Sequence, residues 1–350
     1  MNADESPIEQ LEVTGSHFEV GFAIGERFAM QIQRLLDNYA FFQQQIVPHH
    51  RTPDGRARYQ ALLESSRSRF PNYCVELEGL AQGAKCSFED LFLVNMRGEY
   101  REHLRGTELR GCTDCALLTD EAALIGHNED GSPILRDNMY LIHARVEDAP
   151  AFTALSYPGF LCGNAFGFNA AGVCFSIDNV SPRNVREGVG RQFVARSLLD
   201  ACSLDDAIER ATVPGQAMGF SYTIGSTAER RIVLVEVAPG SYHVRDVRGC
   251  YSHTNHYREL DATQTVGPSS LARLERANTL LRKDPPVDAA GVLSILGDHA
   301  DEGFPIYRTA APPDQSATLY TALFDLDRRS LRIYTGHPAR DADKSVAFAM

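Results

Sequence analysis

The sequence predicts an α+β protein in which layers of sheet and helix are stacked on one another. Up to about residue 111 the apolar residues recur at helical intervals, whereas beyond it short alternating runs dominate. Further helical stretches interrupt these runs, and a last pair of alternating runs closes the chain. Runs of strands, then helices, then strands favour stacked layers over repeated βαβ units. The 350 residues suffice for one large domain or two ordinary ones.

The segment 1–111 is expected to be helical. Residues 17–46 repeat apolar side chains at intervals of three and four over several turns. Residues 52–70 begin with Thr-Pro, a helix-start signal. Ser87 followed three residues later by Asp90 has the shape of a capping box and predicts one more helix start.

The segment 112–350 is expected to hold the sheets. Alternating runs predict strand pairs or triplets at 115–131, 165–180, 220–247 and 317–338. Helical patterns fall between them, at 191–212, 268–283 and 286–300. Two stretches look like linkers or loops, and the second is expected to lie over a pocket: 102–111 and 179–191.

Composition excludes several classes of function. The net charge is −12, with 34 Lys and Arg against 46 Asp and Glu, which disfavours nucleic acid and anionic membranes as partners. The N-terminus shows no secretory signal, and no stretch is apolar for long enough to span a membrane. The eight cysteines are spread thinly, unlike a disulfide framework, so we expect reduced thiols and a cytoplasmic location.

The stretch "RGCTDCALL" at 110–118 allows three interpretations of its cysteines. Cys112 and Cys115 could hold zinc with His253 and His256, although structural zinc sites keep their two ligand pairs close in sequence. A C-x-x-C redox pair would need to open a helix, whereas this one opens a strand-like run. The third interpretation makes Cys112 the first residue of a mature chain.

In the third interpretation the free α-amino group of Cys112 is the general base of its own thiol. Such a group titrates at about 7.7 to 8.0, close to neutral pH, and it is a known activator of nucleophiles. The Gly111–Cys112 bond must first be cut, and glycine leaves room for the thiol to attack the preceding carbonyl. Because this mechanism needs no histidine, His127, His253 and His256 are expected to be structural.

A family resemblance bears on this choice. The stretches "GCT" (111–113), "GHNED" (126–130), "FGFNAAGVCFSIDN" (166–179) and "HTNH" (253–256) occur in this order. Together they resemble the acyl-coenzyme A:6-aminopenicillanic acid acyltransferase family of N-terminal nucleophile hydrolases, which includes β-alanyl-amine hydrolases. The resemblance covers most of the chain. It implies a four-layer αββα sandwich at 112–350, preceded by the helical segment 1–111, and autocleavage into a heterodimer of these two parts.

The resemblance also implies roles for individual residues. Cys112 matches the nucleophile, and the cut falls between Gly111 and Cys112. Asp130 of "HNED" matches an acidic residue that supports the site. Asn255 of "HTNH" matches the side-chain amide of the oxyanion hole, a donor worth roughly 3 to 4 kcal/mol of transition-state stabilisation.

The substrate-binding residues are expected near these positions. Asp178 and Asn179 end the glycine-bearing hairpin, and an acid at 178 suits an amine-bearing substrate such as a β-alanyl group. Asp114 lies two residues after Cys112, which puts it on the same face of a strand. The penicillin-forming relative has an arginine before its "ATLF" strand where this chain has Gln315. The same substrate is therefore less expected here.

The resulting hypothesis is a self-cleaving N-terminal-cysteine amidohydrolase that acts on a small linear amide, first of all an N-β-alanyl amine. An acyltransferase with the same Cys112 is the alternative, and a non-enzymatic zinc- or ligand-binding protein is a further one. No metal or organic cofactor is expected, and coenzyme A would enter only as the acyl donor of a transferase. The expected partners are a small-molecule amide and, after cleavage, the chain's own two fragments, with a possible higher oligomer.

Overall fold

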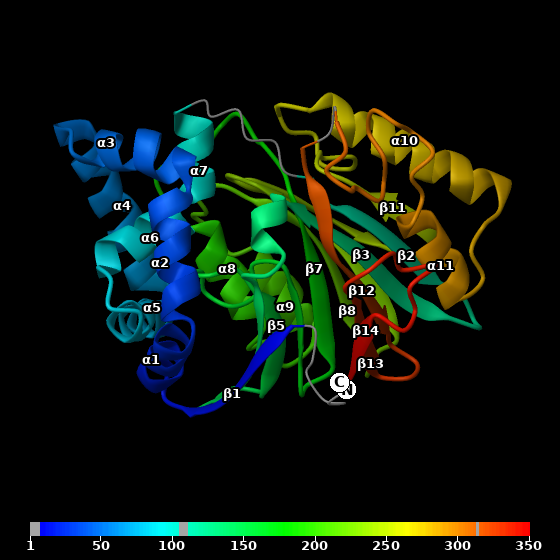
Figure 1. Ribbon diagram of the computed structural model, residues 1–350, viewed down its shortest axis with the longest axis horizontal. Coiled ribbons are helices and arrows are strands. Elements are labelled where there is room, and N and C mark those ends of the chain that lie inside the picture. The colour runs from blue at the N-terminus through cyan, green and yellow to red at the C-terminus, as the bar shows by residue number, and fades with distance from the viewer. Residues whose placement is uncertain (1–7, 105–110, 313–314) are drawn as a thin grey trace.

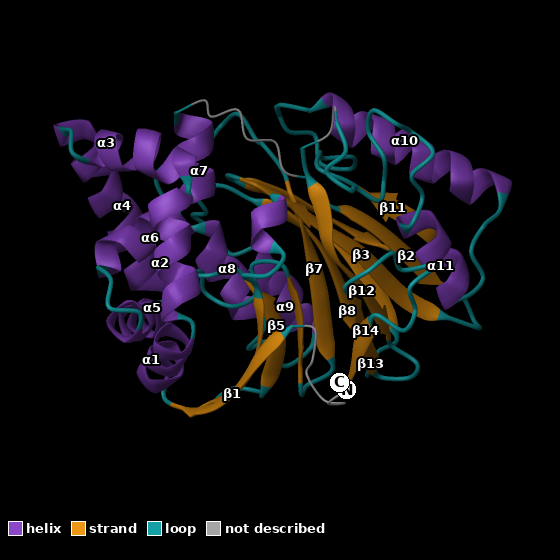
Figure 2. Cartoon of the chain, viewed as in Figure 1, coloured by secondary structure: helices purple, strands orange, loops and turns teal. Residues whose placement is uncertain are grey.

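Two β-sheets form the centre of the molecule, and helices lie beside and over them (Figures 1 and 2). The computed structural model describes residues 8–104, 111–312 and 315–350. The larger sheet has the strand order β1-β4-β5-β6-β7-β8-β9-β10, and the smaller has the order β11-β2-β3-β12-β13-β14. The strands are β1 (Glu9–Gly15), β2 (Thr113–Leu118), β3 (Ala123–Gly131), β4 (Tyr140–Val146), β5 (Phe152–Ser156), β6 (Phe166–Asn169), β7 (Val173–Asn179), β8 (Phe220–Ser226), β9 (Arg231–Ala238), β10 (Ser241–Asp246), β11 (Gly249–His253), β12 (Ala317–Asp325), β13 (Ser330–Tyr334) and β14 (Ser345–Ala349).

Helices fall into an N-terminal group and two later pairs. The N-terminal group is α1 (His17–Arg27), α2 (Ala29–Asn38), the π-helix η1 (Phe42–Ile46), α3 (Val47–His50), α4 (Pro53–Arg69), α5 (Pro71–Gly83), α6 (Phe88–Asn95) and α7 (Arg97–His103). The later helices are the short 3₁₀ turn η2 (Pro133–Leu135), then α8 (Arg191–Leu198), α9 (Leu204–Ala211), α10 (Pro268–Lys283) and α11 (Ala289–Leu296).

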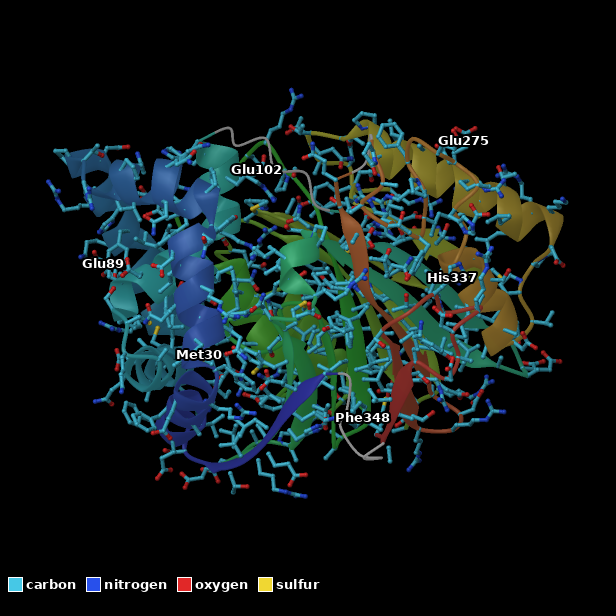
Figure 3. All side chains as sticks on the ribbon, viewed as in Figure 1. Met30, Glu89, Glu102, Glu275, His337 and Phe348 are labelled. Atoms are coloured by element: carbon cyan, nitrogen blue, oxygen red, sulfur yellow. The ribbon has the colours of Figure 1, made fainter. Side chains whose placement is uncertain are left out.

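The layers follow the order helix, sheet, sheet, helix. Strands β2 and β3 of the smaller sheet lie against β7 and β9 of the larger sheet. Helices α10 and α11 pack on the smaller sheet, whereas α9, with α8 beside it, packs on the larger. Side chains fill the space between the sheets (Figure 3). The four-layer αββα sandwich is therefore confirmed.

The N-terminal segment is helical with one exception. Strand β1 pairs in parallel with β4 and forms an edge of the larger sheet. The segment that precedes Cys112 thus contributes a strand to the sandwich, which the helical pattern of 1–111 did not reveal. The predicted linker 102–111 falls mostly on residues 105–110, outside the described part of the chain.

Glycines allow the two central N-terminal helices to touch backbone to backbone. Gly21 and Gly25 of α1 face Gly79 and Gly83 of α5. A Cβ at any of the four would meet a carbonyl oxygen of the other helix closer than van der Waals contact allows. Small residues spaced by four are what such a close crossing requires.

Helix starts agree with the sequence signals. The Thr52 side chain caps α4 by accepting from the Gly55 N–H at 3.0 Å, and the Ser87 side chain caps α6 by accepting from the Asp90 N–H at 3.0 Å. Strands β4, β5 and β14 were not predicted. No helix among the described residues combines the length and apolar character that a bilayer crossing requires.

Candidate active site

Cys112 stands directly before β2 at the junction of the two sheets, and its side chain is buried. It borders a cavity of about 40 Å³. The other lining residues come from both sheets, from α7 and α8, and from the segment between β5 and β6: Arg97, Arg101, Glu129, Asp130, Tyr157, Asn164, Ile177, Asn179, Arg191, Gln192 and Phe220. The cavity brings together a thiol, two carboxylates and three guanidinium groups.

Glu129 is the nearest polar partner of the thiol. Cys112 Sγ donates to Glu129 Oε1 at 4.0 Å, and the Tyr157 hydroxyl donates to the same oxygen. Burial, with the Glu129 carboxylate as a second cause, raises the pKa of the Cys112 thiol to about 12, although His127 opposes the rise. In the uncut chain the thiol is therefore protonated at neutral pH.

A buried histidine links Glu129 to Asp114. His127 Nε2 lies 3.2 Å from Glu129 Oε2, and His127 Nδ1 lies 2.6 Å from Asp114 Oδ1. Burial alone would lower the pKa of His127, but the Asp114 carboxylate and its hydrogen bond raise it well above the usual value. An imidazolium thus bridges two carboxylates, one of which contacts the thiol.

Asn255, which lies just after β11, contacts the backbone of Cys112. Its Oδ1 accepts from the Cys112 N–H at 3.0 Å and from Arg273 Nη2 at 2.6 Å. Its Nδ2 donates to the Asn179 carbonyl at 3.0 Å. Arg273 also donates to the Cys112 carbonyl and, at 2.6 Å, to Thr113 Oγ1. The amide of Asn255 therefore holds the nitrogen that cleavage would turn into an α-amino group.

Gly111 is packed so closely that a side chain there would force Arg273 to shift. A Cβ at this position would overlap the Arg273 guanidinium and approach Asn255 Oδ1. Gly111 borders a second cavity, of about 210 Å³, together with Asn255 and Asn179. Since Asn179 borders both cavities, the Gly111–Cys112 bond lies where they meet.

Asp130 lies in the wall of the Cys112 cavity. Its Oδ1 accepts from the Thr318 hydroxyl at 2.7 Å, and its Oδ2 lies 3.7 Å from Arg308 Nη1. Burial raises the pKa of Asp130 to about 6 although Arg308 lowers it. A β-bulge between Thr318 and Tyr320 of β12 occurs at this point in the sheet.

Asp178 and Asp114 do not border either cavity. Asp178 Oδ2 lies 2.6 Å from His253 Nδ1, and Asp114 Oδ2 accepts from Ser176 at 2.9 Å and from Thr223. Both carboxylates are buried between the sheets. In the uncut chain the expected substrate contact would therefore require both side chains to leave these partners. Asn179 does border the cavity, where its Oδ1 accepts from Arg101 at 3.1 Å.

The cysteine and histidine pairs do not assemble a zinc site. Among the described residues, no metal-like group combines Cys112 and Cys115 with His253 and His256. Cys115 instead lies in the apolar cluster between the smaller sheet and α10–α11, as its strand position predicts.

Sequence reasoning missed part of this site. His127 was expected to be structural, and Glu129, Tyr157, Arg191 and Arg273 were not considered. The signal for two of them was present, because 127 and 129 alternate onto one face of β3 and Asp114 is the register partner of His127. Tyr157, Arg191 and Arg273 reach the site through tertiary packing, which no local pattern encodes.

Comparison with known families decides the identity. The model of the family described as acyl-coenzyme A:6-aminopenicillanic acid acyl-transferase matches residues 117–340, well over half of the chain. The chain belongs to this family. As a member of this family, the protein is an enzyme that acts on amide carbon–nitrogen bonds.

Two curated relatives are similar to this chain along much of their length. The β-alanyl-dopamine/carcinine hydrolase of Drosophila melanogaster is 26% identical over 360 aligned positions, which cover 94% of this chain and 93% of the relative. The 40 kDa form of the acyl-coenzyme A:6-aminopenicillanic-acid-acyltransferase of Emericella nidulans is 26% identical over 256 positions, covering 70% of this chain and 69% of the relative.

Two solved structures are more distant. A variant of the conjugated bile acid hydrolase from Clostridium perfringens has a TM-score of 0.47 and 15% identity, covering 68% of this chain and 92% of that chain. The penicillin V acylase from Agrobacterium tumefaciens has a TM-score of 0.42 and 13% identity, covering 64% and 83%. Because both TM-scores are below 0.5, these structures are not used to assign the fold. The αββα layering is assigned from the sheets and helices of this chain alone.

Proposed function

We propose that the protein is a self-cleaving amidohydrolase with Cys112 as its N-terminal nucleophile. The observation that carries the proposal is the placement of Cys112. The thiol borders a cavity and contacts Glu129, while its backbone nitrogen is held by Asn255. The preceding glycine is packed against the side chains of Arg273 and Asn255. These are the groups that cleavage and later catalysis need, gathered at one peptide bond.

Self-cleavage would begin with the Cys112 thiol. With a pKa of about 12 the thiol needs a base, and the carboxylate that accepts its hydrogen bond is Glu129. The sulfur attacks the Gly111 carbonyl carbon, the C–N bond breaks, and the nitrogen takes up a proton, which leaves Gly111 as a thioester on Cys112. Water then hydrolyses this thioester to a Gly111 carboxylate and a free thiol beside a free α-amino group.

The small size of the Cys112 cavity supports the view that the uncut chain is a precursor. Its volume is about 40 Å³, whereas pockets that hold a small-molecule ligand usually measure about 300 to 1,000 Å³. A substrate amide would need more room beside the thiol than the uncut chain offers.

Catalysis by the mature enzyme would repeat the same chemistry on a substrate. The α-amino group takes the thiol proton, and the sulfur attacks the amide carbonyl. The oxyanion is held by a backbone N–H and by the Asn255 amide, whose Nδ2 carries a second hydrogen besides the one given to Asn179. The α-amino group then protonates the leaving amine, and water hydrolyses the acyl thioester.

The first substrate to test is an N-β-alanyl amine, because the relative similar over 94% of this chain is named for β-alanyl-dopamine and carcinine. Asp178 cannot receive the β-alanyl ammonium group while it is buried against His253. The carboxylates that border the cavity are Glu129 and Asp130, and one of them would take this role.

An acyltransferase outcome remains the second candidate, favoured by the similarity to the penicillin-forming enzyme. Both reactions share the thioester, so product analysis with and without a competing amine separates them. A hydrolase releases the free acid in both conditions, and a coenzyme A thioester is then not needed as donor.

Denaturing mass spectrometry of freshly purified protein, beside a Cys112→Ala control, tests the proposal. Two fragments that meet at Gly111 and Cys112, absent from the control, are expected. A chain that stays at its full 38.6 kDa in both proteins would remove the free amine from the mechanism.

A further inference from the structure

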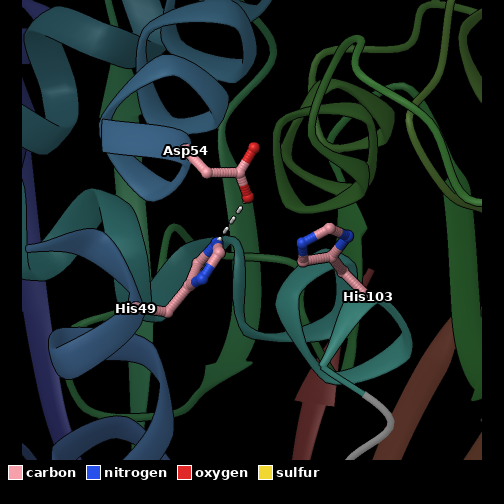
Figure 4. A group of neighbouring side chains, drawn as sticks. All are labelled: His49, Asp54 and His103. Carbon is pink, nitrogen blue, oxygen red and sulfur yellow. Dashed lines mark ion pairs between the residues drawn. The ribbon is translucent and has the colours of Figure 1, made fainter. Parts of the chain in front are cut away.

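A cluster of metal-ligating side chains lies outside the active site, on the N-terminal helices. His49 of α3, Asp54 of α4 and His103 at the end of α7 turn toward one another (Figure 4). One imidazole nitrogen from each histidine and one carboxylate oxygen lie within 4.8 Å of one another. His103 is 54 residues away from His49 in sequence, so the tertiary fold and not a local repeat brings the group together.

The position of His49 is fixed by its surroundings. The His49 carbonyl accepts from the Thr52 N–H at 2.9 Å and from the Thr52 hydroxyl at 2.7 Å. A Cβ at Gly55 would collide with the same carbonyl, so α3 and α4 can meet this closely only because residue 55 is glycine. The His49 ring also packs edge-on against the Tyr100 ring, with 5.9 Å between the centroids.

The polar end of His49 is not satisfied by the protein. Its Nε2 is shielded from solvent and has no hydrogen-bond partner, and the nearest carboxylate oxygen, Asp54 Oδ2, is 3.9 Å away. A buried polar nitrogen without a protein partner requires an explanation, and a bound ion is one. The Asp54 side chain is largely exposed, so it is free to turn toward an ion.

Arg58 lies close to this group and would repel a cation. Its guanidinium, however, is turned to the Tyr100 ring and the Glu99 carbonyl.

We propose that His49, Asp54 and His103 form a binding site for a divalent transition metal of the zinc class. Ligands at about 2.0 to 2.2 Å from zinc lie at most about 3.7 Å apart, so binding would draw these side chains together by about 1 Å. Two imidazoles and a carboxylate leave a fourth position for water, as in open zinc sites.

The site would act as a clamp on α7. This helix also carries Arg97 and Arg101, which border the Cys112 cavity, and it ends two residues before the segment 105–110 that leads to Gly111. A bound ion would join the end of α7 to α3 and α4. Glu102, labelled in Figure 3, marks this end of the helix beside His103.

Zinc binding to the full chain with Cys112→Ala tests the proposal. This background removes the thiol of a second group of candidate ligands, Cys112, His127 and Glu129. A third group, Asp114, His127 and Asp178, is present in every variant compared and so does not distinguish them. Isothermal titration with Zn²⁺ is expected to give one site per chain. In this background His49→Ala or His103→Ala should weaken binding by more than about tenfold.

The matched control is His299→Ala, which removes one histidine of the pair His299 and His337, whose rings lie 5.6 Å apart. It should leave Zn²⁺ affinity unchanged. As a second measurement, Zn²⁺ should raise the melting temperature of the Cys112→Ala chain and not that of the chain that also lacks His103. His103 is exposed, so its loss does not threaten the fold. No binding, or equal affinity in all three histidine variants, would overturn the site.

Discussion

Cys112 and Asn255 are joined by a hydrogen bond of 3.0 Å from the backbone N–H of the first to the side-chain oxygen of the second. The same oxygen accepts from Arg273, which also donates to the Cys112 carbonyl. Both sides of the residue that would become the N-terminus are thus held by side chains from the β11–α10 region. The nitrogen is in place before any bond is cut.

Substitution of Asn255 separates two possible roles of its amide. Asn255→Asp keeps an oxygen for the Cys112 N–H and for Arg273 but has no N–H to offer, whereas Asn255→Ala loses both. If the amide stabilises an oxyanion, each variant should lose about 10² to 10³ in kcat. Single-turnover assays on the cleaved fraction measure this. Full activity in Asn255→Asp would mean that position 255 serves only as an acceptor.

Glu129→Gln is expected to slow self-cleavage by about a hundredfold, since a general base contributes roughly 10² to 10⁴. The variant should also lower the pKa of the Cys112 thiol from about 12, because the carboxylate is one of the groups that raise it. The time course of fragment appearance on denaturing gels measures the first effect. The matched control is Tyr157→Phe, which removes a hydrogen bond to Glu129 and leaves its charge. Equal slowing in both variants would argue against the base.

The two fragments are expected to stay together after cleavage. Glu76 of α5 and Arg196 of α8 form a buried pair across the boundary, with Arg196 Nε 2.9 Å from Glu76 Oε1. Burial alone would raise the pKa of Glu76, yet Arg196 and His17 bring it below its usual value. Strand β1 adds its backbone hydrogen bonds to β4.

Glu76→Gln tests this link, because it leaves Arg196 buried with Asp200 as its remaining carboxylate partner. Breaking a buried pair costs about 3 to 5 kcal/mol, so the fragments should separate at a lower urea concentration. Glu78→Gln removes the partner of Arg67 in an exposed pair and should cost about 1 kcal/mol at most. Size-exclusion chromatography in increasing urea compares them. Identical profiles would show that the pair does not hold the fragments.

The sequence predicted the fold well where one element has its own signal. Strand pairs such as β6–β7 and β12–β13 have alternating patterns with turn residues between them, and α4 and α6 have side-chain caps. Strand β1 has no such signal, because its burial alternates weakly at a sheet edge and long helical patterns follow it. Edge strands are defined by their partner, here β4, and partners are not visible in a local pattern.

The candidate site shows the same division. Cys112, Asp130, Asn179 and Asn255 lie in short motifs, and the structure places all four beside the two cavities, whereas Arg273 reaches the Cys112 carbonyl from 161 residues away in sequence. The spacing of two residues between Cys112 and Asp114 indicated a shared strand face. The face is not enough to decide between substrate contact and burial, because the facing sheet covers this carboxylate with Ser176 and Thr223.

Asp130 should make the folded chain less stable as pH rises from about 4 to about 6. Burial raises its pKa from 3.8 to about 6 in the folded state, so between these values the native chain binds more protons than the unfolded chain. Stability from this group is complete below the unfolded pKa and is lost as pH rises through the folded one. A shift of about two units corresponds to about 3 kcal/mol.

The measurement is urea unfolding of the Cys112→Ala chain with and without Asp130→Asn, which keeps a side-chain oxygen for Thr318 and cannot ionise. Asp178, whose pKa is also raised to about 6, titrates in both proteins and cancels in the comparison. Arg308 lowers the pKa of Asp130, and the value of about 6 already includes this ion pair, so the pair makes the expected fall smaller and does not reverse it. The stability of the parent minus that of the variant should therefore fall as pH rises through this window. A difference that stays flat or increases would mean that Arg308 holds Asp130 ionised down to its ordinary pKa.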